Sequence, residues 1–448
     1  MPHPDSLVDI TVDADIGAAP RDQFSTVALI GSAATEPPDG FNNATRHLDA
    51  ESVASGFGDG TAIHNQAKEV FAEGVGALWA IVLEETETTE VIADSDTNSV
   101  SSGIVSTFPI SGASPVAITV DGDAADPVTA TTESPPPSPP TDEAAYNPDT
   151  GEIEVGTSSS GGGSGGIEVT YTTLSWTAAL DELSGISPDL VALTQRAGEE
   201  SIGDYDELLT WADGEAAAVP VVYPNGSDYS DPITGMDEAH EVGSYLTSKF
   251  GLPIASESSD NVAGRVVGRY AVEEAWYNIF LKTLPLSVPT PTRYDRYVGS
   301  PELQGTFEGG TAADGAGASN VLLSDGGTIL SNSLSLAGLQ SDYRYLDIAR
   351  LEAFVTERIR VAVGNLFRDN DIRYNASGRT SIQAAIEEEL NPITGNRNQP
   401  LRDFSITVPA PEDIPSADRS NRLWTGIMVE ITISGYAHRA DVTLVIEV

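Results

Sequence analysis

The chain has 448 residues, of which 40% are hydrophobic, and its 68 acidic and 22 basic residues give a formal net charge of −46. Because that apolar fraction is too high for a disordered polyanion, we expect a folded protein with a carboxylate-rich surface, typical of solution in molar salt, where the Debye length is about 3 Å. The net charge argues against a broad basic surface that binds nucleic acid. The absence of cysteine excludes disulfides and thiolate metal sites. No apolar run approaches the roughly 20 residues of a membrane span.

The N-terminal segment predicts two short strands. Residues 7–13 alternate strictly, with Val8, Ile10 and Val12 on one face, and Gly17 and Pro20 interrupt the chain before a second strand at 26–31. A strand in this position is either an ordinary edge strand or one that pairs outside its own domain. The first six residues have neither a basic flank nor an apolar core, so no secretory signal is expected.

The next region alternates helical and extended patterns, which predicts an α/β layer of mostly buried strands. The expected helices are 49–55, 62–73, 176–183, 205–212 and 237–250, and the expected strands are 77–83, 189–193 and 219–223. Residues 86–173 contrast with this layer, since they contain short extended runs, turns, and proline-rich and glycine-rich tracts but no helical pattern. We interpret them as a β-rich domain inserted in a surface loop.

The last quarter of the chain has the strongest helix signal. Residues 299–338 are rich in Gly, Ser and Ala and predict a long loop. A helix is then expected at 347–367, with an apolar stripe of Ile348, Leu351, Val355, Ile359, Ala362 and Leu366. A helix at 380–390 and strands at 404–408, 427–434 and 441–448 follow, the last with Val442, Leu444 and Ile446 on one face.

These patterns predict a multidomain α/β (α+β) protein with a β-rich inserted domain and a β-segment at each end, which is either an edge strand or an extended β arm. The expected divisions are an N-terminal arm at 1–22, an α/β domain at 23–85 plus 176–298, an inserted β-rich domain at 86–175, a Gly/Ser-rich loop at 299–339, and a C-terminal domain with a strand arm at 340–448.

No motif indicates catalysis, a cofactor or a metal. The five histidines have no metal-ligand spacing, Gly162–Gly166 fits a nucleophile-elbow pattern only inside a Gly/Ser tract, and no lysine follows glycine as in a phosphate loop. The run from Asp94 begins like a calcium loop but has Ser99 where glycine is required. The sequence therefore predicts a protein that is not an enzyme.

Charge is distributed unevenly along the chain. Residues 340–448 carry twelve arginines and sixteen acids, a net charge of −4, against −42 for the first 339 residues. Such asymmetry indicates that the C-terminal segment faces a partner and the remainder faces solvent. The candidate contact residues are Arg350, Arg358, Arg360 and Arg368, and intrachain pairs with Glu352, Glu357 or Asp369 are an equally good interpretation.

The order of elements resembles the contractile tail sheath protein of myovirus-type phages and contractile injection systems. The likeness rests on Val8–Pro20 followed by Phe24–Gly31, on the helix in Thr61–Gly76, and on the C-terminal series that includes Asp371–Tyr374, Ser416–Arg422 and Trp424–Ile431. It covers roughly residues 5–85, 176–285 and 340–448.

The resemblance implies a structural subunit that stacks as helical hexameric rings around a tail tube and contracts to drive the tube through an envelope. Its arms, with Val8, Ile10, Val12, Val442, Leu444 and Ile446, would add strands to neighbouring subunits, and the arginine-bearing domain would face an acidic tube. The implied partners are sister subunits, the tube, the baseplate and the tail terminator, with neither nucleic acid nor membrane insertion. Combined with the acidity, this points to the virion tail of a haloarchaeal virus or to an injection particle, assembled in the host cytoplasm.

Two other interpretations remain open from the sequence. One is another structural protein of a halophile, such as a capsid or surface-layer component. The other is a halophilic hydrolase that uses scattered carboxylates, for which loss of activity on mutating one Asp or Glu is the test.

Overall fold

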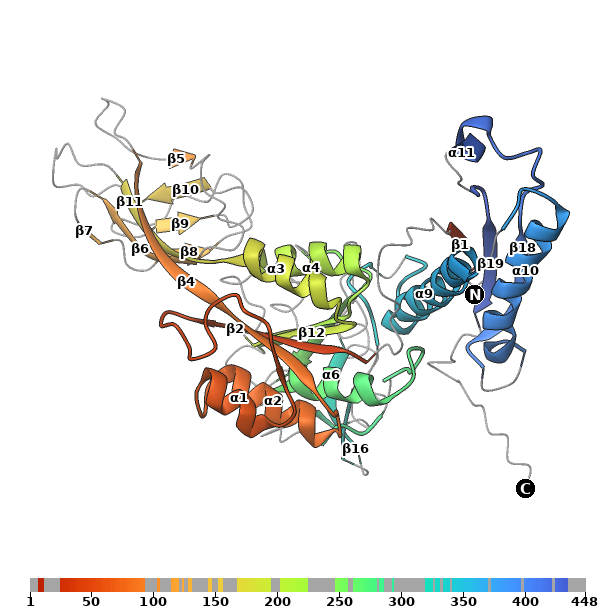
Figure 1. Cartoon of the computed structure of the whole chain (residues 1–448). Coiled ribbons are helices and arrows are strands. Elements are labelled where there is room, and N and C mark those ends of the chain that lie inside the picture. Colours follow the sequence, from red (N-terminus) through yellow and green to blue (C-terminus); the bar gives the residue numbers. More distant parts are fainter. Residues whose placement is uncertain are drawn as a thin grey trace, which may run out of the picture. The chain divides into compact units, whose positions relative to one another are not determined.

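The structure is a computed structural model of the whole chain, and it describes residues 7–11, 25–92, 103–104, 114–120, 123–124, 128–130, 144–146, 152–155, 167–194, 202–224, 246–256, 261–279, 282–285, 292–293, 319–324, 327–330, 333–338, 341–369, 372–395, 399–420 and 424–433 (Figure 1). The chain divides into two compact units. The central unit comprises Ser25–Glu273 and Ile279–Leu346. The terminal unit comprises Met1–Phe24, Glu274–Asn278 and Asp347–Val448, so it contains both ends of the chain.

A mostly parallel sheet forms the core of the central unit. Its strands lie in the order β4 (Leu78–Ile92), β2 (Val27–Ala33), β12 (Leu190–Leu193), β13 (Val219–Pro224) and β14 (Gly251–Ser256), with a parallel bridge from Leu190 to Ala218 joining β12 to the start of β13. In chain order these strands are 2-1-3-4-5, the doubly wound arrangement of an open α/β sheet. Such strands are buried on both faces, and Val27, Ala28, Leu29 and Ile30 are all 0% exposed.

Helices cover both faces of this sheet. Helices α3 (Trp176–Ile186) and α4 (Ile202–Glu215) share a hydrophobic cluster with alternate residues of β2, β4 and β12, including Ala28, Ile30 and Ile81. Helices α2 (Ala62–Ala72) and α6 (Val262–Val272) contact each other and β2, and Figure 1 shows them across the sheet from α3 and α4. The layer predicted from the alternating patterns is therefore present.

One edge of β4 is shared by two partners. Strand β3 (Thr45–His47) pairs antiparallel with Leu78–Ala80 and leads into α1 (Ala50–Phe57). Further along, β4 continues without a break from the parallel sheet into an antiparallel ribbon with β11 (Ile167–Leu174). The insertion boundary expected at residue 86 thus falls inside a continuous strand.

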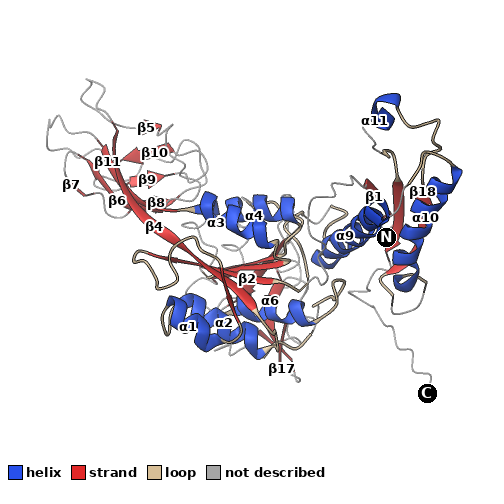
Figure 2. Cartoon of the chain, in the orientation of Figure 1, coloured by secondary structure: helices blue, strands red, loops and turns tan. Residues whose placement is uncertain are grey.

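The described part of the insertion consists of strands (Figure 2). Strand β11 also pairs with β6 (Ser114–Val120), which pairs with β7 (Asp123–Ala124). A separate four-stranded sheet has the order β5 (Gly103–Ile104), β10 (Glu152–Val155), β9 (Ala144–Tyr146) and β8 (Val128–Ala130).

The segment predicted as a loop at 299–339 differs from that prediction. It contains β16 (Ser319–Ser324), which pairs parallel with β14 and with β15 (Thr292–Arg293), and β17 (Gly327–Leu330), which forms a hairpin with β16. The short apolar runs Val321–Leu323 and Ile329–Leu330, separated by Asp325-Gly326, are sufficient for a hairpin despite the surrounding Gly/Ser/Ala composition. The helix predicted at 237–250 lies largely outside the described residues, and its described end, 246–250, is not helical.

The terminal unit packs a three-stranded sheet on two helices. Helix α9 (Leu346–Asp369) places Leu351, Val355, Ile359 and Val363 in a cluster with Ile382, Ile386 and Leu390 of α10 (Ala376–Leu390). The predicted stripe is largely observed, except that Val363 rather than Ala362 enters the core. A 3-10 turn (Asn391–Ile393), β18 (Leu401–Thr407), α11 (Ser416–Ser420) and β19 (Met428–Ile433) follow, and none of the described helices could cross a bilayer.

Candidate interaction site: the sheet of the terminal unit

Strand β19 is the middle strand of the terminal sheet. Its side chains alternate, with Val429, Ile431 and Ile433 buried against the α9–α10 cluster while Met428 is 47% exposed. This period of two follows from the apolar residues at every second position of the strand. One face of the sheet is therefore fixed by the core, and the strand cannot slip by one residue without exposing that apolar set.

Strand β18 flanks β19 on one side. The two strands are antiparallel, and a bulge lies between Leu401 and Asp403. On the outward face Ser405 donates a hydrogen bond to Glu430 Oε2 at 2.7 Å, across the cross-strand pair that the register defines. In the described part of the chain β18 forms an edge of this sheet.

The other flank is occupied by the opposite end of the chain. Strand β1 (Leu7–Thr11) pairs antiparallel with β19, and the register sets Val8 opposite Ile431 and Ile10 opposite Val429. The predicted strand thus exists, and its ladder partner is identified as β19. In the isolated chain that partner belongs to the same molecule. The arm hypothesis expects β1 to lack a partner until a neighbouring subunit supplies one, whereas here β1 is already paired within the monomer.

The remaining predicted arm residues lie outside the described residues. Val12 follows the last described residue of β1, and the strand predicted at 441–448, with Val442, Leu444 and Ile446, comes after the end of the described chain at 433. Their role in contacts between subunits remains a prediction.

The four arginines singled out from the sequence differ in environment. Arg350 is 1% exposed, so its side chain is not available to a partner in this conformation. Arg358 pairs with Glu389 of α10 at 2.7 Å, and Arg360 makes two 2.8 Å contacts with Glu357, one turn earlier on α9. Arg368 lies exposed near the end of α9. The intrachain interpretation accounts for Arg360, and Glu389 is a partner that the sequence analysis did not consider.

A stacked pair of aromatic side chains holds the segment that leads into β19. Trp424 is buried and stacks on Tyr374, with ring centroids 5.3 Å apart and planes 19° from parallel. Stacked pairs of this kind contribute about 0.5–1.5 kcal/mol beyond the area that they bury. The contact ties the start of the central strand to the segment before α10. From the sequence, both residues stand out only as part of the resemblance.

Metal ligands do not converge among the residues that the structure describes, since no group of three His, Cys, Asp or Glu side chains is placed to hold an ion. The geometry of the terminal unit is instead that of a strand-pairing site. The half-buried central strand β19 is flanked by β18, which is close to it in sequence, and by β1 from the other end of the chain.

Comparison with known proteins bears on the fold. Neither a family model nor a curated protein sequence matches this chain. Among solved structures, a chain of the helical sheath of the anti-feeding prophage (AFP) in its contracted state is similar, with 13% identity, 98% of each chain covered and a TM-score of 0.54. A chain of the AFP baseplate gives 12% identity, 98% coverage of both chains and a TM-score of 0.54.

A third similar chain comes from the contracted sheath complex of the extracellular contractile injection system PVC. It is 12% identical, covers 98% of this chain and 96% of its own length, and has a TM-score of 0.52. The predicted fold, a mixed α/β chain of the tail-sheath type, is thereby confirmed: the chain has the fold found in the AFP and PVC sheath structures along nearly its whole length.

Proposed function

We propose that this protein is a structural subunit of a contractile sheath. The observation that carries the proposal is the shared fold over 98% of both chains in the AFP sheath comparison. The subunits would stack as helical hexameric rings around a tube and contract to drive it through an envelope. The tube, baseplate and tail-terminator proteins are the proposed partners, and the assembled location is a virion tail or an injection particle.

Strand exchange is the proposed link between subunits. The terminal unit completes its sheet with a strand that precedes β19 by about 420 residues, so the same ladder can form with β1 of a neighbouring copy. Main-chain hydrogen bonds supply affinity in such strand addition, and the alternation of side chains sets the register. The segment 441–448 is proposed to add to a neighbour's sheet in the same way.

The acidic composition supports a role in concentrated salt. At a net charge of −46, copies packed in a lattice would repel one another strongly at low ionic strength, and molar salt screens this repulsion beyond about 3 Å. We therefore assign the particle to a halophile, with a haloarchaeal virus or injection system as the source. Arg358, Arg360 and Arg368 are retained as candidate tube contacts, and Arg350 is withdrawn because it is buried.

Electron microscopy of the purified protein in high salt tests assembly directly. We expect hollow helical sleeves from the full chain and none after deletion of residues 1–15. Normal sleeves from that truncation would contradict the role of the N-terminal arm.

A cysteine cross-link test distinguishes exchange from self-pairing. Because the chain has no native cysteine, Val8→Cys and Ile431→Cys can be introduced in separate molecules at positions that are opposite in register. Mixed assemblies should form intermolecular disulfides, whereas pairing of Val8→Cys with Met428→Cys, which lies three residues away from the partner position, should not. Cross-linking only within a double variant would show that the strand stays in its own molecule.

A further inference from the structure

The ladder between β1 and β19 sets two acidic residues opposite each other. Asp9 is the only ionisable residue of β1 (Leu7–Thr11), and Glu430 is the only one of β19 (Met428–Ile433). The register places Asp9 directly opposite Glu430. Because like charges at directly opposite positions weaken an antiparallel pair, this ladder contains one cross-strand pair that opposes its own formation.

The Glu430 side chain lies on the outward face of the sheet. Its neighbours along the strand, Val429 and Ile431, are 0% exposed and belong to the core, whereas Glu430 is half-buried. Its Oε2 accepts a hydrogen bond from the hydroxyl of Ser405 at 2.7 Å. A hydroxyl is a neutral donor, so it holds the carboxylate in place without cancelling its charge. That charge therefore acts on any strand that pairs beside β19.

Neighbouring positions of the sheet do not compensate the two acids. The residues two positions away from Asp9 and Glu430 on their own strands are all uncharged: Leu7, Thr11, Met428 and Thr432. The charged residues of β18 are Arg402 and Asp403, which are exposed at its bulge and have opposite signs. In these three strands, no basic residue stands directly opposite or diagonal to Asp9 or Glu430.

We infer that Asp9 and Glu430 form an ionic-strength gate on the β1–β19 ladder, which weakens the pairing in dilute salt and lets it close fully in concentrated salt. The Debye length falls from about 8 Å at physiological ionic strength to about 3 Å at about 1 M, so molar salt screens charges on adjacent strands of an exposed sheet face. Without screening, one such cross-strand charge pair changes the pairing equilibrium by up to about fivefold.

The gate acts on the pairing itself, so it applies to β1 of the same molecule and to β1 of another. Its consequence for assembly rests on the strand exchange proposed above: the same pair would oppose exchange at low ionic strength and permit it in molar salt. This effect is local, unlike the general repulsion that a net charge of −46 produces. Replacement of a single residue should therefore remove it.

Hydrogen exchange of the full-length chain, kept dilute enough to remain monomeric, measures the ladder. Glu430→Gln removes the charge and keeps an oxygen that can accept from Ser405. In dilute KCl, the amides of residues 7–11 should exchange up to about fivefold more slowly in this variant than in the wild type, and in molar KCl the two proteins should exchange alike. Sucrose in all samples favours the folded state without adding ions, and the amides of β12 report that both proteins remain folded.

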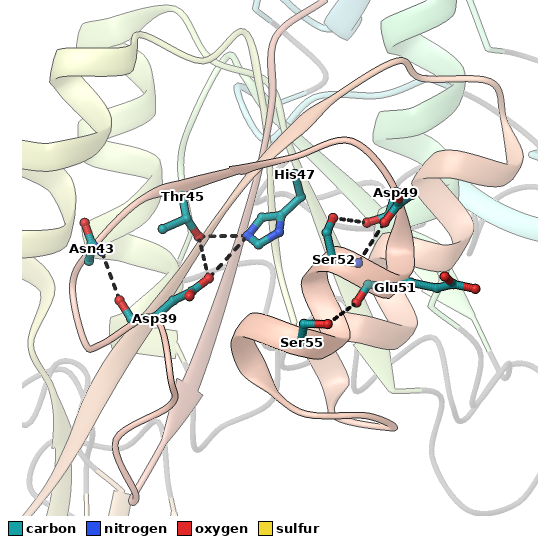
Figure 3. Close-up of polar contacts among 8 residues, drawn as sticks. All are labelled: Asp39, Asn43, Thr45, His47, Asp49, Glu51, Ser52 and Ser55. Atoms are coloured by element: carbon teal, nitrogen blue, oxygen red, sulfur yellow. Dashed lines mark hydrogen bonds and ion pairs between the residues drawn. The ribbon is translucent and has the colours of Figure 1, made fainter.

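A matched variant controls for the change in net charge. Asp49→Asn also removes one exposed carboxylate, but at the start of α1, where the Asp49 side chain accepts the N–H of Ser52 at 2.7 Å (Figure 3). Asparagine is an equally good residue at a helix N-terminus, so the helix should be retained. Exchange of residues 7–11 should be the same as in the wild type at both salt concentrations.

Charge reversal tests the sign of the effect. Asp9→Lys places a basic residue opposite Glu430, so the repulsive pair becomes an attractive one. Relative to the wild type, protection of residues 428–433 should increase most in dilute KCl, and the increase should shrink as salt is added. A residue that acts only through its shape would not respond to salt in this way.

Three results would overturn the inference: no gain of protection for Glu430→Gln in dilute KCl, an equal gain at both salt concentrations, or a gain for Asp9→Lys that does not shrink as salt is added. Because exchange is measured on monomers, these outcomes do not depend on the formation of sleeves. Failure of the wild type to form sleeves in high salt would instead count against the proposed function.

Discussion

The central sheet and the terminal sheet of this protein are assembled from the chain in opposite ways. The central sheet takes the parallel strands β4, β2, β12, β13 and β14 in a compact winding order, and helices cover both faces. Among the described residues, the terminal sheet has one face covered by helices, and it obtains its third strand from residues 7–11. The difference separates a sheet built from one continuous part of the chain from a sheet that needs a distant segment, which under the proposed strand exchange a neighbouring copy would supply.

The largest effect is expected from a buried ion pair of the central unit. Arg265, with 11% of its side chain exposed, pairs with Glu69 and, at 2.9 Å, with Glu73, whose side chain is 5% exposed. Arg265→Leu should lower the free energy of unfolding by up to about 3–5 kcal/mol, because the buried Glu73 carboxylate loses one of its two partners and keeps only Arg269, at 3.1 Å. Chemical denaturation of the variant checks this, and replacing Glu73 by Gln as well should recover part of the loss.

Matched truncations in the two sheets should separate stability from assembly. Ile431→Ala and Leu29→Ala each remove a side chain that is 0% exposed, so each should cost about 2–5 kcal/mol of unfolding free energy. Ile431 lies in the strand that accepts β1, so only its variant should also lose sleeves in conditions where both proteins remain folded. Equal assembly of the two variants would argue against the terminal sheet as the linking element.

A smaller effect is expected where α6 contacts α2. A Cβ at Gly264 would lie 2.5 Å from the Gln66 carbonyl oxygen, so Gly264→Ala should force the helices apart and cost about 1–3 kcal/mol. A Cβ added at Gly214 in α4 would meet no described atom within 4 Å, and Gly214→Ala should instead stabilise by about 0.5–1 kcal/mol. Thermal unfolding of both variants tests the pair, and a similar response from each would contradict close helix packing.

The smallest effect is expected at the surface of the terminal unit. Arg358 and Glu389 are 35% and 31% exposed in their side chains, so a double-mutant cycle with Arg358→Leu and Glu389→Gln should give a coupling below about 1 kcal/mol. If Arg358 contacts an acidic tube, its replacement should weaken tube binding much more than it changes stability. A coupling comparable with the loss at Arg265 would remove the contrast between the two units.

The periodic spacing of apolar residues was sufficient to predict the helices and strands whose buried residues lie close together in the sequence. The apolar stripe of α9 and the buried run of β12 were predicted within a few residues of their observed bounds. Helix α6 was missed, although Gly264 and Gly268 are spaced for close helix contact, because glycine lowers helix propensity and the compensation comes from α2.

Long-range pairing was beyond the reach of the sequence. The alternation in residues 7–13 predicted a strand but not its partner, which lies at the other end of the chain. Likewise, the charge asymmetry and the resemblance directed attention to four arginines, but only packing decides that Arg350 is interior and that Arg358 pairs with Glu389. The composition predicts the net charge, but the fold determines which charged residues form ion pairs.

The uninterrupted course of β4 has a consequence for engineering. Its final pair with β11, Ile92 with Ile167, fixes two chain ends about 5 Å apart at the tip of a regular ladder. A foreign module whose own termini are similarly close could replace residues 93–166, which keeps the eight pairs between β4 and β11 in the chain and removes the ladder between β11 and β6. The antiparallel ribbon of β4 and β11 would then serve as a scaffold that carries the inserted domain.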